Sequence, residues 1–143
     1  MFISTRGRYA LRILIDMAEQ SGNKYIKLKD IAERQGISEK YLESIVKELV
    51  KSHIVVGLRG KGGGYRLSKE PDKINVGEVL RIMEGSLAPV ACLEEGGEPC
   101  PRAYMCRTLE FWRGLDETIR KYTDKYTVAD LVKTPETGND YII

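Results

Sequence analysis

Apolar residues recur at helical spacing through most of the first half of the chain. Residues 4–22 predict a helix with apolar positions on more than one face, so it should be largely buried. Two shorter helical patterns follow at 28–35 and 38–50, and a tight turn with Gly36 separates them. Ser38 is a natural N-cap for the second pattern. Two helices joined in this way predict a helix-turn-helix.

The next segment predicts a β-hairpin. An apolar run at 54–56 and a short second strand at 65–68 flank a glycine-rich turn at 60–64, and a hairpin directly after a helix-turn-helix makes a winged helix. The turn carries Arg59 and Lys61; glycines let a backbone approach a phosphate closely, and cations neutralise it. No helix follows the glycines, which excludes a Walker-type loop and a dinucleotide fingerprint. A plain hairpin turn remains the alternative.

The second half returns to helical periodicity. Asn75 caps a helix that Gly85 ends, a long helix is predicted at 104–126, and a capping box at 127–130 starts one more helical turn. Apolar residues of the long helix alternate spacings of three and four, at Trp112, Leu115, Ile119, Tyr122 and Tyr126. Such a seam favours packing against a partner copy of the same helix, and packing on the chain's own first helix is the alternative.

We therefore predict a mainly α fold with a small β-hairpin, a winged helix-turn-helix domain plus a long dimerisation helix. The winged helix-turn-helix occupies 1–84, and a cysteine-bearing loop follows at 85–107. The dimerisation helix and last helical turn occupy 108–132, and residues 133–143 form a C-terminal tail.

Charge is divided unequally between the two halves of the chain. Residues 1–70 carry 14 Lys and Arg against 8 Asp and Glu, whereas residues 71–143 carry 9 against 13. A polyanion would dock on the basic half, although an unevenly charged solvated surface is the alternative.

The sequence shows neither a secretory pattern nor the ~20 apolar residues of a membrane span, so we expect a cytoplasmic location. The one histidine, His53, has no plausible nucleophile near it in sequence, and we expect no enzyme.

All three cysteines lie in one stretch, CLEEGGEPCPRAYMC. An odd number of clustered thiols in a reducing compartment indicates metal or redox chemistry more than disulfides. Zinc sites usually show C-x2-C pairs and a fourth ligand, and the pairs are absent here. A reversible disulfide between two of the three would make a thiol switch without metal. Both readings stay open on the residues alone.

Three segments together resemble a known family: STRGRYALRILIDMA, IAERQGISEKYLE and LRGKGGGYRLSKEPDKINVGEVLRIMEG. They are similar to the winged-helix repressors that include the iron–sulfur regulator IscR, the nitric oxide sensor NsrR and the cysteine-metabolism repressor CymR. The resemblance runs from Met1 to about Val132 and implies a homodimeric repressor of a double-stranded DNA operator. It assigns base reading to the second helix of the helix-turn-helix, where groove-reading residues lie near the N-terminus. The DNA-contacting residues that it implies are Thr5, Arg6, Ser38, Lys40, Tyr41, Glu43, Arg59 and Lys61.

The resemblance also implies a cofactor. In the iron–sulfur members three cysteines occupy this loop, so Cys92, Cys100 and Cys106 would hold an iron–sulfur cluster, [2Fe–2S] rather than [4Fe–4S], that modulates DNA binding. The family adds a fourth ligand, either a histidine three residues past the third cysteine or an acidic residue near position 8. Here Leu109 and Arg8 stand there, and neither can ligate. Available carboxylates are Glu94, Glu95, Glu98 and Glu110.

The last residues give a cluster-free alternative. Tyr141, Ile142 and Ile143 resemble the tails that enter the active site of O-acetylserine sulfhydrylase in serine acetyltransferase and, in outline, in CymR-type repressors. Backbone N–H groups that bind a carboxylate, with a pocket for an apolar side chain, suffice for such docking. A tail folded back on its own dimer is the plain alternative. An adaptor with a degenerate winged helix is a further one, and salt-dependent binding to duplex DNA would tell it apart.

Overall fold

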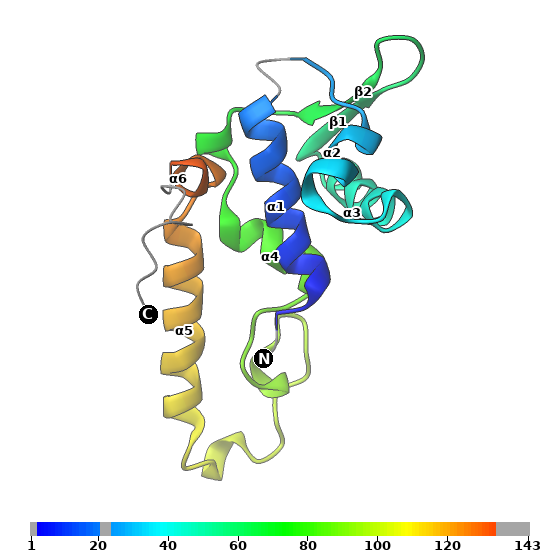
Figure 1. Cartoon of the computed structure of the whole chain (residues 1–143). Helices are drawn as coiled ribbons and strands as arrows, with labels where there is room; N and C mark the ends of the chain where they lie inside the picture. Colours follow the sequence, from blue (N-terminus) through cyan, green and yellow to red (C-terminus); the bar gives the residue numbers. More distant parts are fainter. Residues whose placement is uncertain (1–2, 21–23, 134–143) are drawn as a thin grey trace, which may run out of the picture.

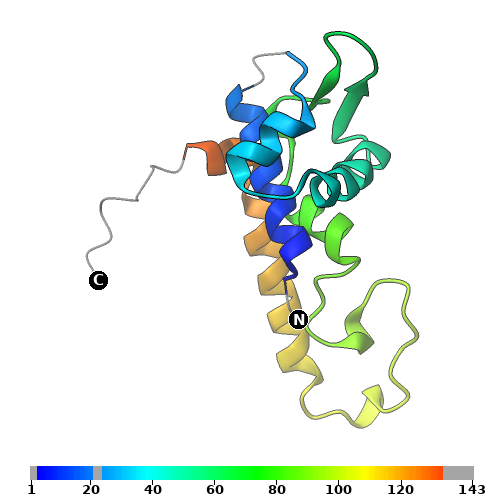
Figure 2. The same cartoon turned by 45° about the vertical axis from the view of Figure 1, so that its right-hand side comes forward.

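The computed structural model of the chain describes residues 3–20 and 24–133. In chain order its elements are α1 (Thr5–Gln20), α2 (Leu28–Gln35), α3 (Glu39–Lys51), β1 (Val55–Leu58), β2 (Gly64–Leu67), α4 (Val76–Glu84), α5 (Leu109–Lys125) and α6 (Val128–Val132), with 3₁₀ turns at Pro71–Lys73, Ala91–Leu93 and Ala103–Met105. Helix α1 is central: α3 and the hairpin lie on one side of it and α6 on the other (Figure 1). Figure 2 shows α5 and the segment before it extending away from this body.

Helix α1 provides the centre of the core because its apolar positions face both flanking layers. Ala10, Ile13, Leu14 and Met17 are fully buried. They share one cluster with the buried face of α3, which consists of Leu42, Ile45, Val46 and Leu49. Burying a side chain of this size stabilises the fold by about 1.5–3 kcal/mol relative to exposure. The periodicity expected of these two helices is confirmed.

The helix-turn-helix has the turn that the sequence predicts. Gly36 adopts a left-handed conformation with φ 65°, and its N–H donates to the Ala32 carbonyl, which ends α2. Ser38 then caps α3, since its Oγ accepts a hydrogen bond from the N–H of Tyr41 at 3.2 Å. A glycine in the left-handed region and a serine N-cap each meet a backbone requirement that few residues satisfy.

The hairpin pairs β1 with β2 in antiparallel register, from Val55 opposite Leu67 to Leu58 opposite Gly64. The predicted hairpin is confirmed, with its second strand one residue earlier than expected. A third extended segment lies on the other edge of β2: Ile26 and Tyr65 exchange both backbone hydrogen bonds at 2.8 Å. Gly64, with φ 150°, is needed there because any Cβ would collide with the Ile26 backbone.

A buried charge holds α1 to α2. The Asp16 side chain is only 2% exposed, and its carboxylate accepts hydrogen bonds from Arg34 Nη2 at 2.7 Å and from Gln35 Nε2 at 2.9 Å. The hydrogen bond to Asp16 raises the pKa of Arg34 above its ordinary value. A buried carboxylate needs such partners, so this contact fixes how α2 and the following α3 sit on α1.

The long helix begins later than its sequence pattern predicts. We expected it to start near Tyr104, but α5 begins at Leu109, and a 3₁₀ turn that Cys106 ends precedes it. The reason is local: Cys106 is extended, with ψ 109°, and Tyr104 is 85% exposed, so no buried face continues the helix backwards.

The caps expected at Asn75 and at 127–130 are both present. Within the described residues, no helix combines the length and apolar character needed to cross a bilayer.

Candidate nucleic-acid interface and cysteine loop

The residues at the start of α3 that are expected to contact DNA differ in how exposed their side chains are. Lys40 and Glu43 are exposed. Ser38 is exposed too, but its hydroxyl also caps the helix. Tyr41 is half-buried and packs edge-on against Tyr9, with ring centroids 5.9 Å apart. Tyr41 is therefore only partly free to contact DNA, because it also packs against the core.

A groove joins α3 to the hairpin. Its volume is 450 Å³, and its lining residues are Glu43, Lys47, Val50, Gly57, Leu58, Arg59 and Tyr65. The structure thus brings together Glu43 from α3 and Arg59 from the wing, which lie 16 positions apart in sequence. Lys47 is an addition that the sequence reasoning missed. The signal was available, since Lys47 lies one helical turn after Glu43 on the exposed face of α3.

The exposed lysines of the helix-turn-helix and wing, and Arg59, take part in none of the ion pairs recorded for the described residues. Apart from the pair of Arg34 with Asp16, every recorded ion pair lies on α4, α5 or the cysteine loop. These exposed cations are Lys24, Lys27, Lys29, Lys40, Lys47, Lys51, Arg59, Lys61 and Lys69. Such a surface attracts a polyanion, and glycines in the wing let it approach closely.

The start of α1 lies apart from α3 and the wing along the chain. Thr5 is exposed and its Oγ1 accepts a hydrogen bond from Arg8 Nη2 at 3.0 Å. Arg6 is half-buried. Ser4 hydrogen bonds through both its N–H and its hydroxyl to Glu84 Oε1, at 3.1 and 2.7 Å, which fixes the helix start against α4. Thr5 and Arg6 are thus held at a defined position.

The cysteine loop carries the donor type of an iron–sulfur site without a gathered ligand set. Cys92 and Cys106 are exposed, and Cys100 is half-buried. The Cys106 Sγ lies 3.5 Å from the Thr108 hydroxyl, and this hydrogen bond, helped by backbone N–H groups and Arg102, lowers the pKa of the Cys106 thiol. Among the described residues, no three His, Cys, Asp or Glu side chains are grouped closely enough to hold a metal ion. Accessible thiolates suit a cluster chemically, but the loop must rearrange to bring them together.

The structure separates the four carboxylates that are candidates for the fourth ligand of a cluster into paired and unpaired ones. Glu95 pairs with Arg120 of α5 at 2.8 Å, and this hydrogen bond lowers the pKa of Glu95. Glu110 pairs with Arg113 at 2.8 Å. Glu94 and Glu98 are exposed, and neither has an ion pair recorded in the described residues. These two are the carboxylates that could bind without first giving up a cation.

Helix α5 has a seam that its own chain covers only partly. Ile119 and Tyr126 pack against the cluster around Val76 and Leu80, whereas Leu115, Tyr122 and Phe111 remain exposed. Beside them lies a groove of 310 Å³, lined by Ile3, Leu80, Leu87, Thr118, Ile119, Tyr122 and Thr123. Part of the seam thus packs within its own chain, but mainly against α4 and not against the first helix, which was the alternative expected from the sequence.

Comparison with known proteins decides the family. The family model described as "Rrf2: Iron-dependent Transcriptional regulator" matches residues 3–134. The chain belongs to the Rrf2 family. Among its Rrf2 relatives, IscR of Erwinia tasmaniensis is 39% identical over 136 residues, which cover 95% of this chain and 81% of that protein. CymR of Bacillus subtilis is 39% identical over 131 residues, which cover 92% and 89%. These relatives are named HTH-type transcriptional regulators, so this Rrf2 protein is a transcriptional regulator and not an enzyme.

Solved structures give the same fold. The structure of CymR (YrzC), described as the global cysteine regulator of B. subtilis, superposes with a TM-score of 0.77 at 37% identity and covers 95% of this chain and 99% of that one. IscR of T. potens superposes with a TM-score of 0.75 at 34% identity and covers 97% and 91%. The winged helix-turn-helix and the DNA-binding class predicted from the sequence are confirmed. The expected tail residues Tyr141, Ile142 and Ile143 lie outside the described residues.

Proposed function

We propose that this Rrf2-family regulator is a homodimeric repressor that binds operator DNA through α3 and the wing. The observation that carries the proposal is the groove between Glu43 and Arg59, surrounded by exposed cations that make no recorded ion pair in the described residues. In this arrangement Lys40 and Glu43 face base edges, and Glu43 accepts from a cytosine amino group. Arg59 and Lys61 contact the minor groove or phosphates, and Ser38, Tyr41, Thr5 and Arg6 hold the backbone.

The DNA arm is tested with Arg59→Ala. Loss of one contact to a phosphate reduces the steepness of log K, where K is the association constant, against log salt concentration by about 0.9. At 0.1 M salt this corresponds to roughly an eightfold weaker affinity. Lys133→Ala is the control, since it removes the same charge from the residue that follows α6, a helix on the other side of α1 from the wing. Operators selected from a random duplex library supply the DNA. Equal affinities for Arg59→Ala and wild type would refute the assignment.

We propose that Cys92, Cys100 and Cys106 hold an iron–sulfur cluster, with [2Fe–2S] preferred, and that their state sets DNA affinity. A bound cluster supplies a redox-active group that oxidants can alter. The chain's own part is mechanical: the loop runs directly into α5, and Glu95 ties it to Arg120. A change in how the thiols are held therefore moves the start of α5. If α5 pairs with a partner copy through Phe111, Leu115 and Tyr122, this shifts the spacing of the two α3 helices.

The cluster is tested on protein purified without oxygen. Wild type should show visible absorbance with matching iron and sulfide, and Cys100→Ala should lose both while it stays a folded dimer. If Cys100→Ala unfolds, the thiols are structural and the sensing role fails. A colourless wild type without metal would favour a thiol switch between two of the three cysteines.

The likeness to CymR supports a second candidate. In a cluster-free repressor of cysteine or sulfur metabolism, Tyr141, Ile142 and Ile143 would enter the active site of O-acetylserine sulfhydrylase. The B. subtilis relative is described as a global cysteine regulator. Deletion of the three residues should abolish binding to that enzyme and leave DNA binding intact. Undiminished binding of the truncated chain would exclude this partner.

A further inference from the structure

A second basic surface lies at the edge of the wing opposite β1. In the segment KYIKLK, residues 24–29, Ile26 is buried, whereas Lys24, Lys27 and Lys29 are exposed. The two backbone hydrogen bonds between Ile26 and Tyr65 fix this segment to the outer edge of β2. The Arg66 guanidinium lies 4.7 Å from the centre of the Tyr25 ring, which adds a side-chain contact to the same junction. Lys24 and Lys27 therefore flank the residue that pairs with the wing sheet, and Lys29 follows in the first turn of α2.

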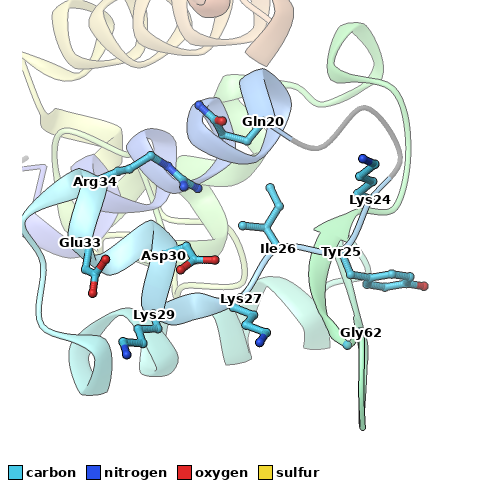
Figure 3. Close-up of a pocket in the computed structure, with 11 residues that line it drawn as sticks. Gln20, Lys24, Tyr25, Ile26, Lys27, Lys29, Asp30, Glu33, Arg34 and Gly62 are labelled. Carbon is cyan, nitrogen blue, oxygen red and sulfur yellow. The ribbon is translucent and has the colours of Figure 1, made fainter.

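These lysines line a pocket of 590 Å³ between the start of α2 and the wing turn, which contributes Gly62 and Gly63. Figure 3 shows Gly62 across the pocket from Glu33. Figure 3 shows Lys27 and Lys29 pointing to the same side, away from Gln20. Gly62 has φ 78° and open space around its Cα, so a ligand meets backbone there without a side chain in the way. Cations opposite an open backbone turn suit a phosphate.

Acidic side chains in the same pocket do not cancel the lysines. Asp30 and Glu33 also line it. Arg34 also lines the pocket but pairs with the buried Asp16, so the pocket sets three lysines against two carboxylates. None of the recorded ion pairs in the described residues involves Lys24, Lys27 or Lys29. The positive charge at the mouth is available to an external anion.

We infer that Lys27 and Lys29 form a docking site for the sugar–phosphate backbone of duplex DNA. The inference rests on the proposed function and extends it. Duplex DNA fits better than a small anion because the pocket is larger than one phosphate needs and continues from the wing turn that carries Arg59 and Lys61. A wing in a groove places the flanking phosphates beside its outer edge. The site supplies affinity without sequence preference, since phosphates carry no base information.

The test is the salt dependence of binding to a 40-bp duplex of arbitrary sequence, because a phosphate contact needs no operator. For Lys27→Gln/Lys29→Gln the slope of log K against log salt should fall by about 1.8 per bound protomer, which is roughly a 60-fold loss at 0.1 M salt. Lys73→Gln/Lys133→Gln is the matched control: it removes the same charge from exposed positions at the 3₁₀ turn before α4 and at the end of α6. The control should keep the wild-type slope.

Two further readings separate the possible failures. Duplexes of different base composition should all weaken by the same factor, whereas a composition-dependent loss would overturn a pure backbone role. An unchanged slope in the lysine variant would also overturn the inference, and weaker binding of inorganic phosphate or of an acidic peptide by that variant would then identify the true ligand class. If wild type itself shows no salt-dependent DNA binding, the proposed function has failed rather than the lysine site. Thermal unfolding checks that both variants fold.

Discussion

Replacement of Asp16 by Ala should destabilise the protein far more than the loss of an ordinary ion pair. The Asp16 carboxylate accepts three hydrogen bonds from Arg34, of 3.3, 3.0 and 2.7 Å, and one of 2.9 Å from Gln35, and its side chain is 2% exposed. Breaking a buried pair costs about 3–5 kcal/mol because one charge is left unpaired. Arg34 is 37% exposed and can be rehydrated, so we expect the lower end, about 3 kcal/mol.

The assay is reversible unfolding in urea, with the thermal midpoint as a second readout. About 3 kcal/mol corresponds to a fall in Tm of roughly 9 °C for a chain of this size. Asp124→Ala is the matched control: Asp124 pairs with Arg81 at 2.9 Å, but its side chain is 45% exposed, so we expect a loss of about 0–1 kcal/mol. Equal losses for the two variants would refute the argument that burial sets the magnitude. In Asp16→Ala/Arg34→Met the loss should be smaller than the sum of the single losses, since no charge remains unpaired.

Two more predictions follow from single backbone and side-chain features. His53 has φ 62°, a conformation that is strained for a residue with a Cβ, so His53→Gly should stabilise the fold by about 0.5–1 kcal/mol in urea unfolding. Ser52→Gly is the control: Ser52 has φ −89°, and the change should destabilise the fold by a similar amount. A lower stability of His53→Gly would contradict the claim that the backbone at residue 53 is strained. With the other two cysteines replaced by Ala, the rate of Cys106 alkylation is measured against pH. Its pH midpoint should lie below the ordinary thiol pKa of about 8.5, because the lowered pKa of Cys106 keeps the thiolate populated at lower pH. Thr108→Val should move that midpoint up, and an unmoved midpoint would exclude the hydroxyl as the cause.

Features that depend on a few consecutive residues could be predicted from the sequence. The cap at Ser38, the cap at Asn75 and the capping box at 127–130 each satisfy backbone N–H groups within three residues, so local chemistry determines them. The periodicity of α1 and α3 identified their buried faces for the same reason. The late start of α5 was missed because apolar spacing near Tyr104 imitates a helix, although those side chains have nothing to pack against.

Contacts between distant residues could not be derived from these patterns. Asp16 shows in the sequence as a charge on an otherwise apolar helix face, but nothing there names Arg34 and Gln35 as its partners. The pairing of Ile26 with Tyr65 joins segments 39 positions apart, and neither carries a turn signal toward the other. The packing of Tyr41 on Tyr9 is of the same kind and changes how much of the recognition helix is free.

The cysteine loop is the part in which neither sequence spacing nor the shared fold decides the chemistry. A CymR and an IscR superpose on this chain almost equally well, with TM-scores of 0.77 and 0.75, so the scaffold is common to regulators with different names. What differs must lie in side chains that the scaffold presents, and here these are three accessible thiols and the carboxylates between them. The recorded ion pair between this loop and α5, Glu95 with Arg120, is exposed and therefore screened by salt, so it offers little resistance to rearrangement. A loop held this weakly and joined directly to α5 can gather its thiols around a ligand while the winged helix above it keeps its packing.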